Sequence, residues 1–519
     1  MNIMSDLYKR STSERFRQYF EKSSSIIESH ARYSLAQMAC SEPQEKRKWE
    51  NGLAGVPLFW EPSVKTVYTD QKDTHTLVIG PTGSKKSRLV AMPQVRILGS
   101  AKENMIITDP KAEIYRRTAD YLEKQGYTIF VLNLRDPNRG DAWNPLDIPY
   151  EYYRRGEVDR AYEFVNDVSE NLMHSKEAHG DPFWNDSAGD FFFGLTILLF
   201  KYCKENNLDK NYITLNNVIA LKRHLLSQTP KEARSNPSYL LQFANKDPII
   251  SANLVGTIET AEETRGGIVS SFDRNIRLFS IQPNLMDMLS GNTISLDRIN
   301  EEPTAIYIIL PDEKTGYHAI GSLFIKQSYE YLIYLAQKNS NNQIDTAALE
   351  RRVNYIIDEF ASLPTIHDFP ALITAARSRN IRFTLIAQGK NQLLQRYKEE
   401  TETIMTNCSN WIILSCREHI FLEEISALCG KTFGNPTLSV VPPDSIQRLE
   451  KNSGEALLLS GRSKPFITHL PDINSYDNEN YMIRPLEHRG ETPVAHLDFG
   501  RMPVTIQEYI SKLSQIDKS

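Results

Sequence analysis

Short apolar runs and helical patterns alternate in two separated parts of the chain. The runs cover residues 76–79, 104–108 and 128–133 in the first part, and 305–310, 353–357, 382–387, 411–414 and 456–459 in the second. A long helical pattern covers residues 317–337. Short, continuously apolar strands between helices are typical of a parallel sheet with helices on both faces. The pattern therefore predicts an α/β fold in which both parts of the chain complete one mostly parallel sheet.

The residues between these two parts, 151–297, follow a helical period and contain few β-branched runs. They predict an all-α domain that interrupts the α/β domain. Its longest apolar run, 191–200, is about half the ~20 residues of a membrane-spanning helix, and we interpret it as a buried core helix. The basic segment 259–277 carries Arg265, Arg274 and Arg277. A solvated helix face is favoured for these arginines over nucleic-acid contacts.

Changes in pattern divide the chain into five parts. We predict an N-terminal helical segment (1–50), the α/β domain in two parts (51–150 and 298–472), the all-α domain between them (151–297) and a C-terminal tail (473–519). Apolar residues at helical spacing within residues 11–39 predict an amphipathic helix. Its apolar face either packs on the protein's own core or docks on a partner or membrane subunit.

Composition and charge exclude few classes of protein function. A chain of 519 residues is expected to hold about two to four domains. The formal net charge of -5 argues against a uniformly basic coat for nucleic acid, but a local basic channel is compatible with it. The five cysteines form no C-x-x-C pair and no zinc spacing. They are typical of buried thiols in a reducing compartment, and no structural metal is implied.

The segment after the first apolar run nearly matches the pattern G-x-x-x-x-G-K-[ST] of phosphate-binding loops. The candidate phosphate-binding residues are Gly80, Pro81, Thr82, Gly83, Ser84, Lys85, Lys86 and Ser87. Lys85 departs from the pattern, which has glycine there because the backbone passes close to the phosphates. We expect Lys86 to reach the β and γ oxygens of ATP and Ser87 to hold Mg²⁺. The alternative is a lysine-rich turn that caps a helix.

Two adjacent acids, Asp358 and Glu359, end the apolar run 353–357. Two carboxylates at the end of a buried strand are costly unless they have a function. In a P-loop ATPase the first acid supports the magnesium shell and the second polarises the attacking water. We therefore expect Asp358 to join Ser87 at Mg²⁺ and Glu359 to act in hydrolysis.

Gln388 and one of two arginines are further candidates for contacting the γ-phosphate. Gln388 ends the run 382–387, and ligands bind outside the carboxyl ends of parallel strands. Arg377 and Arg379 lie on the helix that precedes this run. In a ring ATPase an arginine there can reach the γ-phosphate of the next subunit, and we prefer Arg377 for this role. The alternative is an ordinary surface helix with two arginines.

Several motifs occur together in one order. They are the segments 76–87, 107–113, 143–146, 264–265, 358–361 and 385–388. This set resembles the VirD4/TraG family of type IV secretion coupling proteins over residues 60 to about 470. The resemblance implies a RecA-like P-loop ATPase domain interrupted by an all-α domain. It also implies a homo-hexamer that binds ATP and Mg²⁺ and couples hydrolysis to the export of DNA with its relaxase, or of effector proteins, through a secretion channel.

The chain departs from the family pattern at its N-terminus, because no run of the sequence is long enough for the usual membrane-spanning helices. We therefore expect either a separate membrane-anchor subunit, contacted through residues 11–39, or a soluble motor. The expected location is the cytoplasm, at the inner face of the cell membrane.

Three functions are compatible with these patterns. The first is an active hexameric ATPase that feeds DNA or nucleoprotein to the secretion channel. The second is a nucleotide-impaired platform that recruits cargo, because Lys85 replaces the loop glycine. The third, a chromosome-partitioning or repair translocase, is disfavoured by Asp109-Pro110-Lys111 after the second apolar run. In that motif we expect Asp109 to be the N-cap of a helix and Pro110 its first residue.

Overall fold

The computed structural model describes most of the chain in two compact units. The described residues are 39–41, 54–61, 66–173, 181–235, 238–339, 347–432, 435–461, 465–476, 482–490 and 495–499. The first unit comprises residues 1–131, 296–315 and 328–485, and the second comprises 132–295, 316–327 and 486–519. The helix predicted within residues 11–39 lies outside the described residues, except for residue 39.

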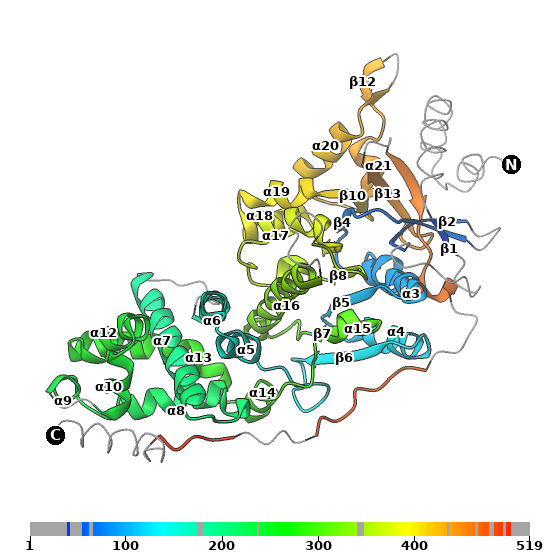
Figure 1. Ribbon diagram of the computed structural model, residues 1–519. Helices are drawn as coiled ribbons and strands as arrows, with labels where there is room; N and C mark the ends of the chain where they lie inside the picture. The colour runs from blue at the N-terminus through cyan, green and yellow to red at the C-terminus, as the bar shows by residue number, and fades with distance from the viewer. Residues whose placement is uncertain are drawn as a thin grey trace. The chain divides into compact units, whose positions relative to one another are not determined.

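A nine-stranded sheet forms the core of the first unit (Figure 1). In spatial order its strands are β14 (Phe466–His469), β13 (Glu455–Ser460), β10 (Cys408–Ile413), β4 (His75–Ile79), β9 (Ile381–Ala387), β8 (Val353–Ile357), β5 (Asn104–Asp109), β7 (Thr304–Ile309) and β6 (Thr128–Asn133). The pairs from β10 to β7 are parallel, whereas β13 is antiparallel to both β10 and β14. The prediction of one mostly parallel sheet completed by both parts of the chain is confirmed.

Helices cover both faces of this sheet, so successive side chains of a strand are buried on opposite faces. On one face Gln94 of α3 (Met92–Ala101) donates a hydrogen bond to Thr384 of β9 at 2.9 Å. On the other face Tyr355 and Phe383 stack with ring centroids 4.9 Å apart and contact Tyr329 of α16 (His318–Asn339). Figure 1 shows α3 and α16 on opposite sides of β8 and β5. The buried positions on both faces explain why the strands read as continuous apolar runs.

The other helices of the first unit connect or flank these strands. They are α4 (Glu113–Lys124), α15 (Arg298–Glu301), α17 (Phe369–Ala376), α18 (Lys390–Tyr397), α19 (Glu400–Asn407), α20 (His419–Leu428) and α21 (Pro443–Gln447). The long helix expected over residues 317–337 is α16.

Two small sheets of the first unit were not predicted. The first contains β1 (Ala39–Ser41), β3 (Thr66–Asp70) and β2 (Val56–Glu61), paired antiparallel in this order. The second pairs β11 (Lys431–Thr432) with β12 (Asn435–Ser439). Strand β2 contains Pro57, and its register with β3 shifts between Pro57 and Phe59. A proline and a bulge interrupt the alternation by which a strand is recognised.

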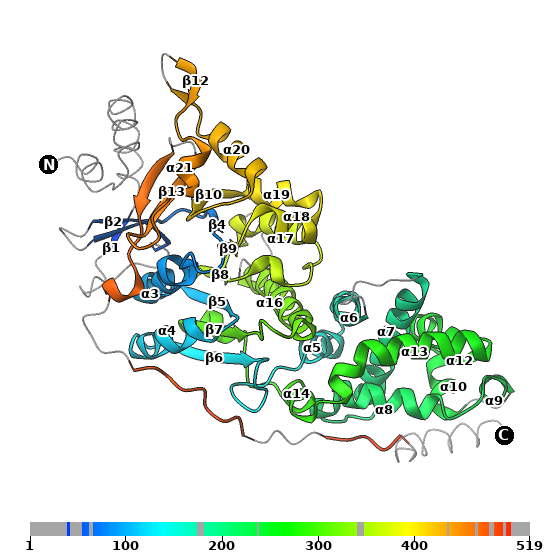
Figure 2. The same ribbon diagram turned by 180° about the vertical axis from the view of Figure 1, so that it is seen from behind.

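The second unit is built from helices. They are α5 (Asp147–Arg155), α6 (Val158–Met173), α7 (Phe183–Glu205), α8 (Leu215–Leu225), α9 (Pro230–Ser235), α10 (Tyr239–Asn245), α11 (Pro248–Ile250), α12 (Gly256–Glu259), α13 (Glu262–Ser280) and α14 (Pro283–Met288). Helix α7 contacts both α8 and α13 (Figure 2). Phe191 and Phe192 of α7 are fully buried against Phe272 of α13. The apolar run 191–200 therefore belongs to a buried core helix. Within the described ranges, no helix has the length and apolar character needed to span a bilayer.

The described end of the predicted C-terminal tail packs on the second unit. The Asn217 side chain donates a hydrogen bond to the Ala495 carbonyl at 2.8 Å and accepts one from the Leu497 amide at 3.0 Å. Phe499 is buried and contacts the ring of Tyr202, with the two centroids 5.7 Å apart. Residues 495–499 are therefore part of the helical unit and not a peripheral extension.

Candidate nucleotide site

The segment from Gly80 to Lys86 connects β4 to a helix that begins at Ser87 and continues into α3. Two glycines of this loop are required by its geometry. A Cβ atom on Gly80 would lie 2.5 Å from the Ser84 hydroxyl oxygen. Gly83 has a φ of +79°, which lies in the left-handed region. The loop thus turns tightly and leads directly into a helix N-terminus, the geometry of an anion-binding loop.

Lys85 adopts the backbone conformation that a glycine would adopt at its position. Its φ is +66°, in the left-handed region that costs a non-glycine residue about 1 kcal/mol or more. Its ammonium donates a 3.5 Å hydrogen bond to Asn452, which lies before β13 and outside the loop. The substitution therefore leaves a glycine-like backbone in place, and the long side chain has a partner elsewhere.

The neighbouring Lys86 is directed into the loop. Its side chain is 6% exposed, and its ammonium lies 2.7 Å from the carbonyl oxygen of Gly80 and 3.4 Å from that of Pro81. The Glu359 carboxylate lies 3.8 Å away. A lysine ammonium held at this point carries its charge where β and γ phosphates would bind.

Ser87 and Asp358, the two residues predicted to bind Mg²⁺, lie side by side in the structure. The Ser87 hydroxyl donates a 2.8 Å hydrogen bond to the carboxylate of Asp358, which follows β8. The Thr108 hydroxyl donates to the Asp358 carbonyl at 2.9 Å and so fixes the end of β8 against β5. Burial raises the pKa of Asp358 to about 6, although the hydrogen bond from Ser87 acts in the opposite direction. Hydroxyl and carboxylate oxygens are the ligands that Mg²⁺ prefers.

Glu359 and Gln388 also meet at this edge of the sheet. The Gln388 amide donates a 3.0 Å hydrogen bond to the Glu359 carboxylate. Strand β9, which ends just before Gln388, lies between β4 and β8 in the sheet. Glu359 has a φ of +54°, and its amide donates to the Asp358 side chain at 3.0 Å. A non-glycine residue held in the left-handed region is typical of functional sites.

The buried hydroxyl of Ser84 fits a phosphate ligand. Its oxygen is buried and has no hydrogen-bond partner among the described residues. A buried hydroxyl without a partner is unfavourable, so the loop offers a donor that a phosphate oxygen can satisfy. Of the predicted phosphate-binding residues Gly80 to Ser87, the structure thus gives Ser84 and Lys86 groups suited to this contact.

Asp109 is a member of the acidic end of the sheet that the sequence did not assign to the site. It lies at the end of β5, and burial raises its pKa to about 7, while the Asp358 charge acts in the same direction. Its carboxylate accepts hydrogen bonds from the amides of Glu113 and Tyr115 at 3.0 and 2.8 Å. The expected cap position was wrong, because α4 begins at Glu113 and Pro110 lies in the preceding turn.

Arg377 lies away from these residues within the chain. It precedes β9 and pairs with Asp73, which precedes β4, at 3.2 Å. Both residues are therefore at the amino ends of their strands, whereas Lys86 and Gln388 follow the carboxyl ends. The Arg379 guanidinium donates to the carbonyl of Ala347 at 3.0 Å. A role of Arg377 between subunits stays a prediction.

Comparison with known proteins gives the family. The family model described as "Type IV secretory system Conjugative DNA transfer" matches residues 36–448. The chain belongs to this family. The resemblance to VirD4/TraG-type coupling proteins is thereby confirmed. A comparison with curated proteins finds no match.

Solved structures of the conjugative coupling protein TrwB are similar to this member of the conjugative DNA transfer family. The complex of TrwB with a non-hydrolysable ATP analogue has a TM-score of 0.53 at 14% identity, covering 87% of this chain and 98% of TrwB. The complex with ADP and Mg²⁺ has a TM-score of 0.51 at 15% identity, covering 81% and 87%. At such identities the likeness concerns the fold, and it confirms the RecA-like P-loop architecture.

Proposed function

We propose that this chain is the coupling ATPase of a type IV secretion or conjugation system. It binds ATP with Mg²⁺ at the loop 80–87, and hydrolysis drives the transfer of DNA with its relaxase, or of effector proteins. The observation that carries the proposal is the hydrogen bond between Ser87 and Asp358, because it joins the loop to the acidic strand end. TrwB, which has a similar fold, has been solved with an ATP analogue and with ADP and Mg²⁺.

Each residue has a distinct role in this proposal. Lys86 and the Ser84 hydroxyl bind phosphate oxygens, while Ser87 and Asp358 supply oxygen ligands for Mg²⁺. The metal ion neutralises charge on the β and γ phosphates. Glu359 accepts a proton from the attacking water, and the Gln388 amide orients the Glu359 carboxylate.

The proposal extends to assembly and location. We propose a homo-hexamer in which Arg377 reaches the γ-phosphate bound by a neighbouring subunit, as an arginine does in other ring ATPases. The ring would work on the inner face of the cell membrane, beside components of the secretion channel. A separate membrane subunit would hold it there through residues 11–39.

Lys85 favours one alternative, a platform that recruits cargo without using nucleotide. Its Cβ stands where the pattern of phosphate-binding loops has only hydrogen, and crowding there weakens phosphate binding. Two observations support the active motor instead. The backbone of Lys85 keeps the left-handed conformation, and its ammonium binds Asn452 outside the loop.

Nucleotide binding and DNA-stimulated hydrolysis by the purified chain separate the two functions. We expect the wild type to bind ATP in the presence of Mg²⁺, and we expect Ser87→Ala to lose most of the magnesium dependence. Glu359→Gln should bind ATP with wild-type affinity and hydrolyse it about 10²-fold to 10⁴-fold more slowly, because the general base is lost. If only Lys85→Gly binds and hydrolyses ATP while the wild type does neither, the recruitment platform is correct.

A further inference from the structure

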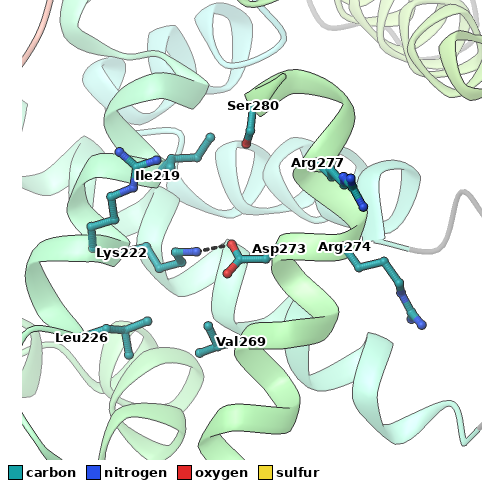
Figure 3. A pocket seen from close by; sticks show the side chains of 9 residues that line it. Ile219, Lys222, Leu226, Val269, Asp273, Arg274, Arg277 and Ser280 are labelled. Carbon is teal, nitrogen blue, oxygen red and sulfur yellow. Dashed lines mark hydrogen bonds and ion pairs between the residues drawn. The ribbon is translucent and has the colours of Figure 1, made fainter. Parts of the chain in front are cut away.

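The helical unit contains a pocket between α8 and α13 (Figure 3). Its volume is about 730 Å³, within the range of sites that hold a ligand or a short peptide segment. Ile219 of α8 and Leu226, which directly follows α8, line the pocket together with Val269 and Ser280 of α13. All the lining residues belong to the helical unit, so the pocket shares no residue with the candidate nucleotide site.

An ion pair crosses the pocket. Lys222 of α8 points toward Asp273 of α13 and pairs with its carboxylate (Figure 3). The Lys222 side chain is only 6% exposed, and its ammonium lies 4.8 Å from the centroid of the Phe272 ring. Asp273 is 56% exposed. The Lys222 ammonium is therefore buried at the base of the pocket, while Asp273, the one acid among the lining residues, is exposed to solvent.

Two arginines add positive charge at the same pocket. Arg223 and Arg277 are exposed, and neither guanidinium has an ion pair or hydrogen bond within the part of the chain that the structure describes. Arg265 and Arg274 differ, because they donate to the Gln228 carbonyl and the Asn185 side chain at 3.0 and 3.2 Å. The guanidinium groups of Arg223 and Arg277 can therefore pair with carboxylate groups at the rim of the pocket.

We propose that this pocket binds an acidic peptide segment of a partner protein that carries one apolar side chain between carboxylates. The apolar side chain would contact Leu226 and Val269, and the carboxylates would pair with Arg223 and Arg277. This site works whether or not the chain hydrolyses ATP, so its test is independent of the proposed motor activity.

A nucleic-acid backbone fits the same surface less well. Asp273 repels phosphates and carboxylates alike, so it does not distinguish the two ligands, whereas Leu226 and Val269 contribute nothing to a phosphate contact. A peptide with an apolar side chain and carboxylates can contact both the apolar residues and the arginines of the pocket. Burial of the apolar side chain then adds to the charge pairing. The mixed lining therefore favours peptide over nucleic acid.

Fluorescence anisotropy with the full chain tests the proposal. The probe is a short fluorescein-labelled peptide with one leucine flanked by aspartates on both sides. We expect saturable binding that weakens about tenfold in the double variant Arg223→Glu/Arg277→Glu, because two favourable charge pairs become repulsive. Val269→Ser should also weaken binding, and Asp273→Asn should tighten it. A peptide with alanine in place of the leucine should bind more weakly.

The matched control reverses two charges elsewhere in the helical unit. Arg154→Glu/Arg155→Glu alters the exposed face of α5, where the two arginines lie 3.8 and 4.0 Å from Glu151. This control should bind the peptide as the wild type does, and thermal melts should show that all variants are folded. Equal binding by wild type and Arg223→Glu/Arg277→Glu would overturn the proposal. So would an oligothymidylate that displaces the peptide and depends equally on the two arginines but not on Val269.

Discussion

Replacing Lys85 with glycine should stabilise the folded chain, although it removes a side chain that forms a hydrogen bond. The φ of +66° is a conformation that costs a residue with a Cβ about 1 kcal/mol and costs glycine little. The hydrogen bond from Lys85 to Asn452 is long, at 3.5 Å, and exposed. Such a bond contributes less than about 0.5 kcal/mol. The net gain in the free energy of unfolding should therefore be between about 0.5 and 1 kcal/mol.

Urea denaturation can measure this gain when two further variants accompany Lys85→Gly. Lys85→Ala removes the ammonium but keeps the Cβ, so it should not gain stability. Gly83→Ala makes the opposite change at a φ of +79°, where the nearest atom to an added Cβ is the Lys451 ammonium nitrogen at 3.9 Å. With no steric clash, its loss of about 1 kcal/mol reports the conformational cost alone.

The order of the variants decides whether the reasoning is correct. We expect the midpoint of unfolding to rise for Lys85→Gly, to stay near wild type for Lys85→Ala and to fall for Gly83→Ala. If Lys85→Gly is no more stable than Lys85→Ala, the loop does not hold residue 85 in the left-handed region. In that case the claim that the loop keeps a glycine-like backbone is refuted.

Three further predictions concern the nucleotide site. The pKa of Asp358 is raised to about 6 in the folded chain, so its contribution to stability is present at low pH and is lost as the pH rises through 6. Wild type should therefore lose about 1 kcal/mol relative to Asp358→Asn between about pH 5 and pH 7, measured by urea denaturation of the nucleotide-free chain. If wild type and Asp358→Asn showed the same pH dependence of stability, this prediction would be wrong. Gln388→Ala should lower the rate of ATP hydrolysis but less than Glu359→Gln does, and an effect on ATP affinity instead would exclude an orienting role. Arg377→Ala should abolish hydrolysis in the assembled ring while Asp73→Ala preserves it; equal small losses would mean that the ion pair at the amino ends of the strands is the whole role of Arg377.

Much of the fold could be predicted because the buried strands carry their own signal. Strands β8 and β6 begin and end at the predicted residues, and the other six predicted strands differ by at most a few residues, whereas the edge strand β14 was not predicted. A strand buried on both faces needs apolar side chains at every position, so its limits are visible in sequence. Strands β2 and β3 pack in a small antiparallel sheet with a proline and a bulge. Their residues lack that signal, and they were missed.

The chemistry of the site was also visible in part. That Ser87, Asp358 and Lys86 lie close together could be predicted because each belongs to a motif with a fixed place relative to a strand end. The environment of Asp109 could not be assigned, because its raised pKa results from burial beside β8 and from the nearby charge of Asp358. Arg377 shows a related limit. The sequence places it before a strand, but only the structure shows its ion pair with Asp73 at the opposite end of the sheet from Lys86.

The hydrogen bond between Gln388 and Glu359 depends on the order of strands, which no local pattern specifies. Along the chain, β8 and β9 follow each other, whereas β4 is separated from both by the helical unit. In the sheet β9 lies between β4 and β8, so the residue after β9 is placed between the phosphate loop and the acidic pair. Had β9 been added beside β6, at the edge of the sheet, Gln388 would end far from Lys86. Because β9 lies between β4 and β8, the carboxyl ends of these three strands lie side by side and form one candidate site. The loop that contains Lys85 follows β4 and forms one side of this site.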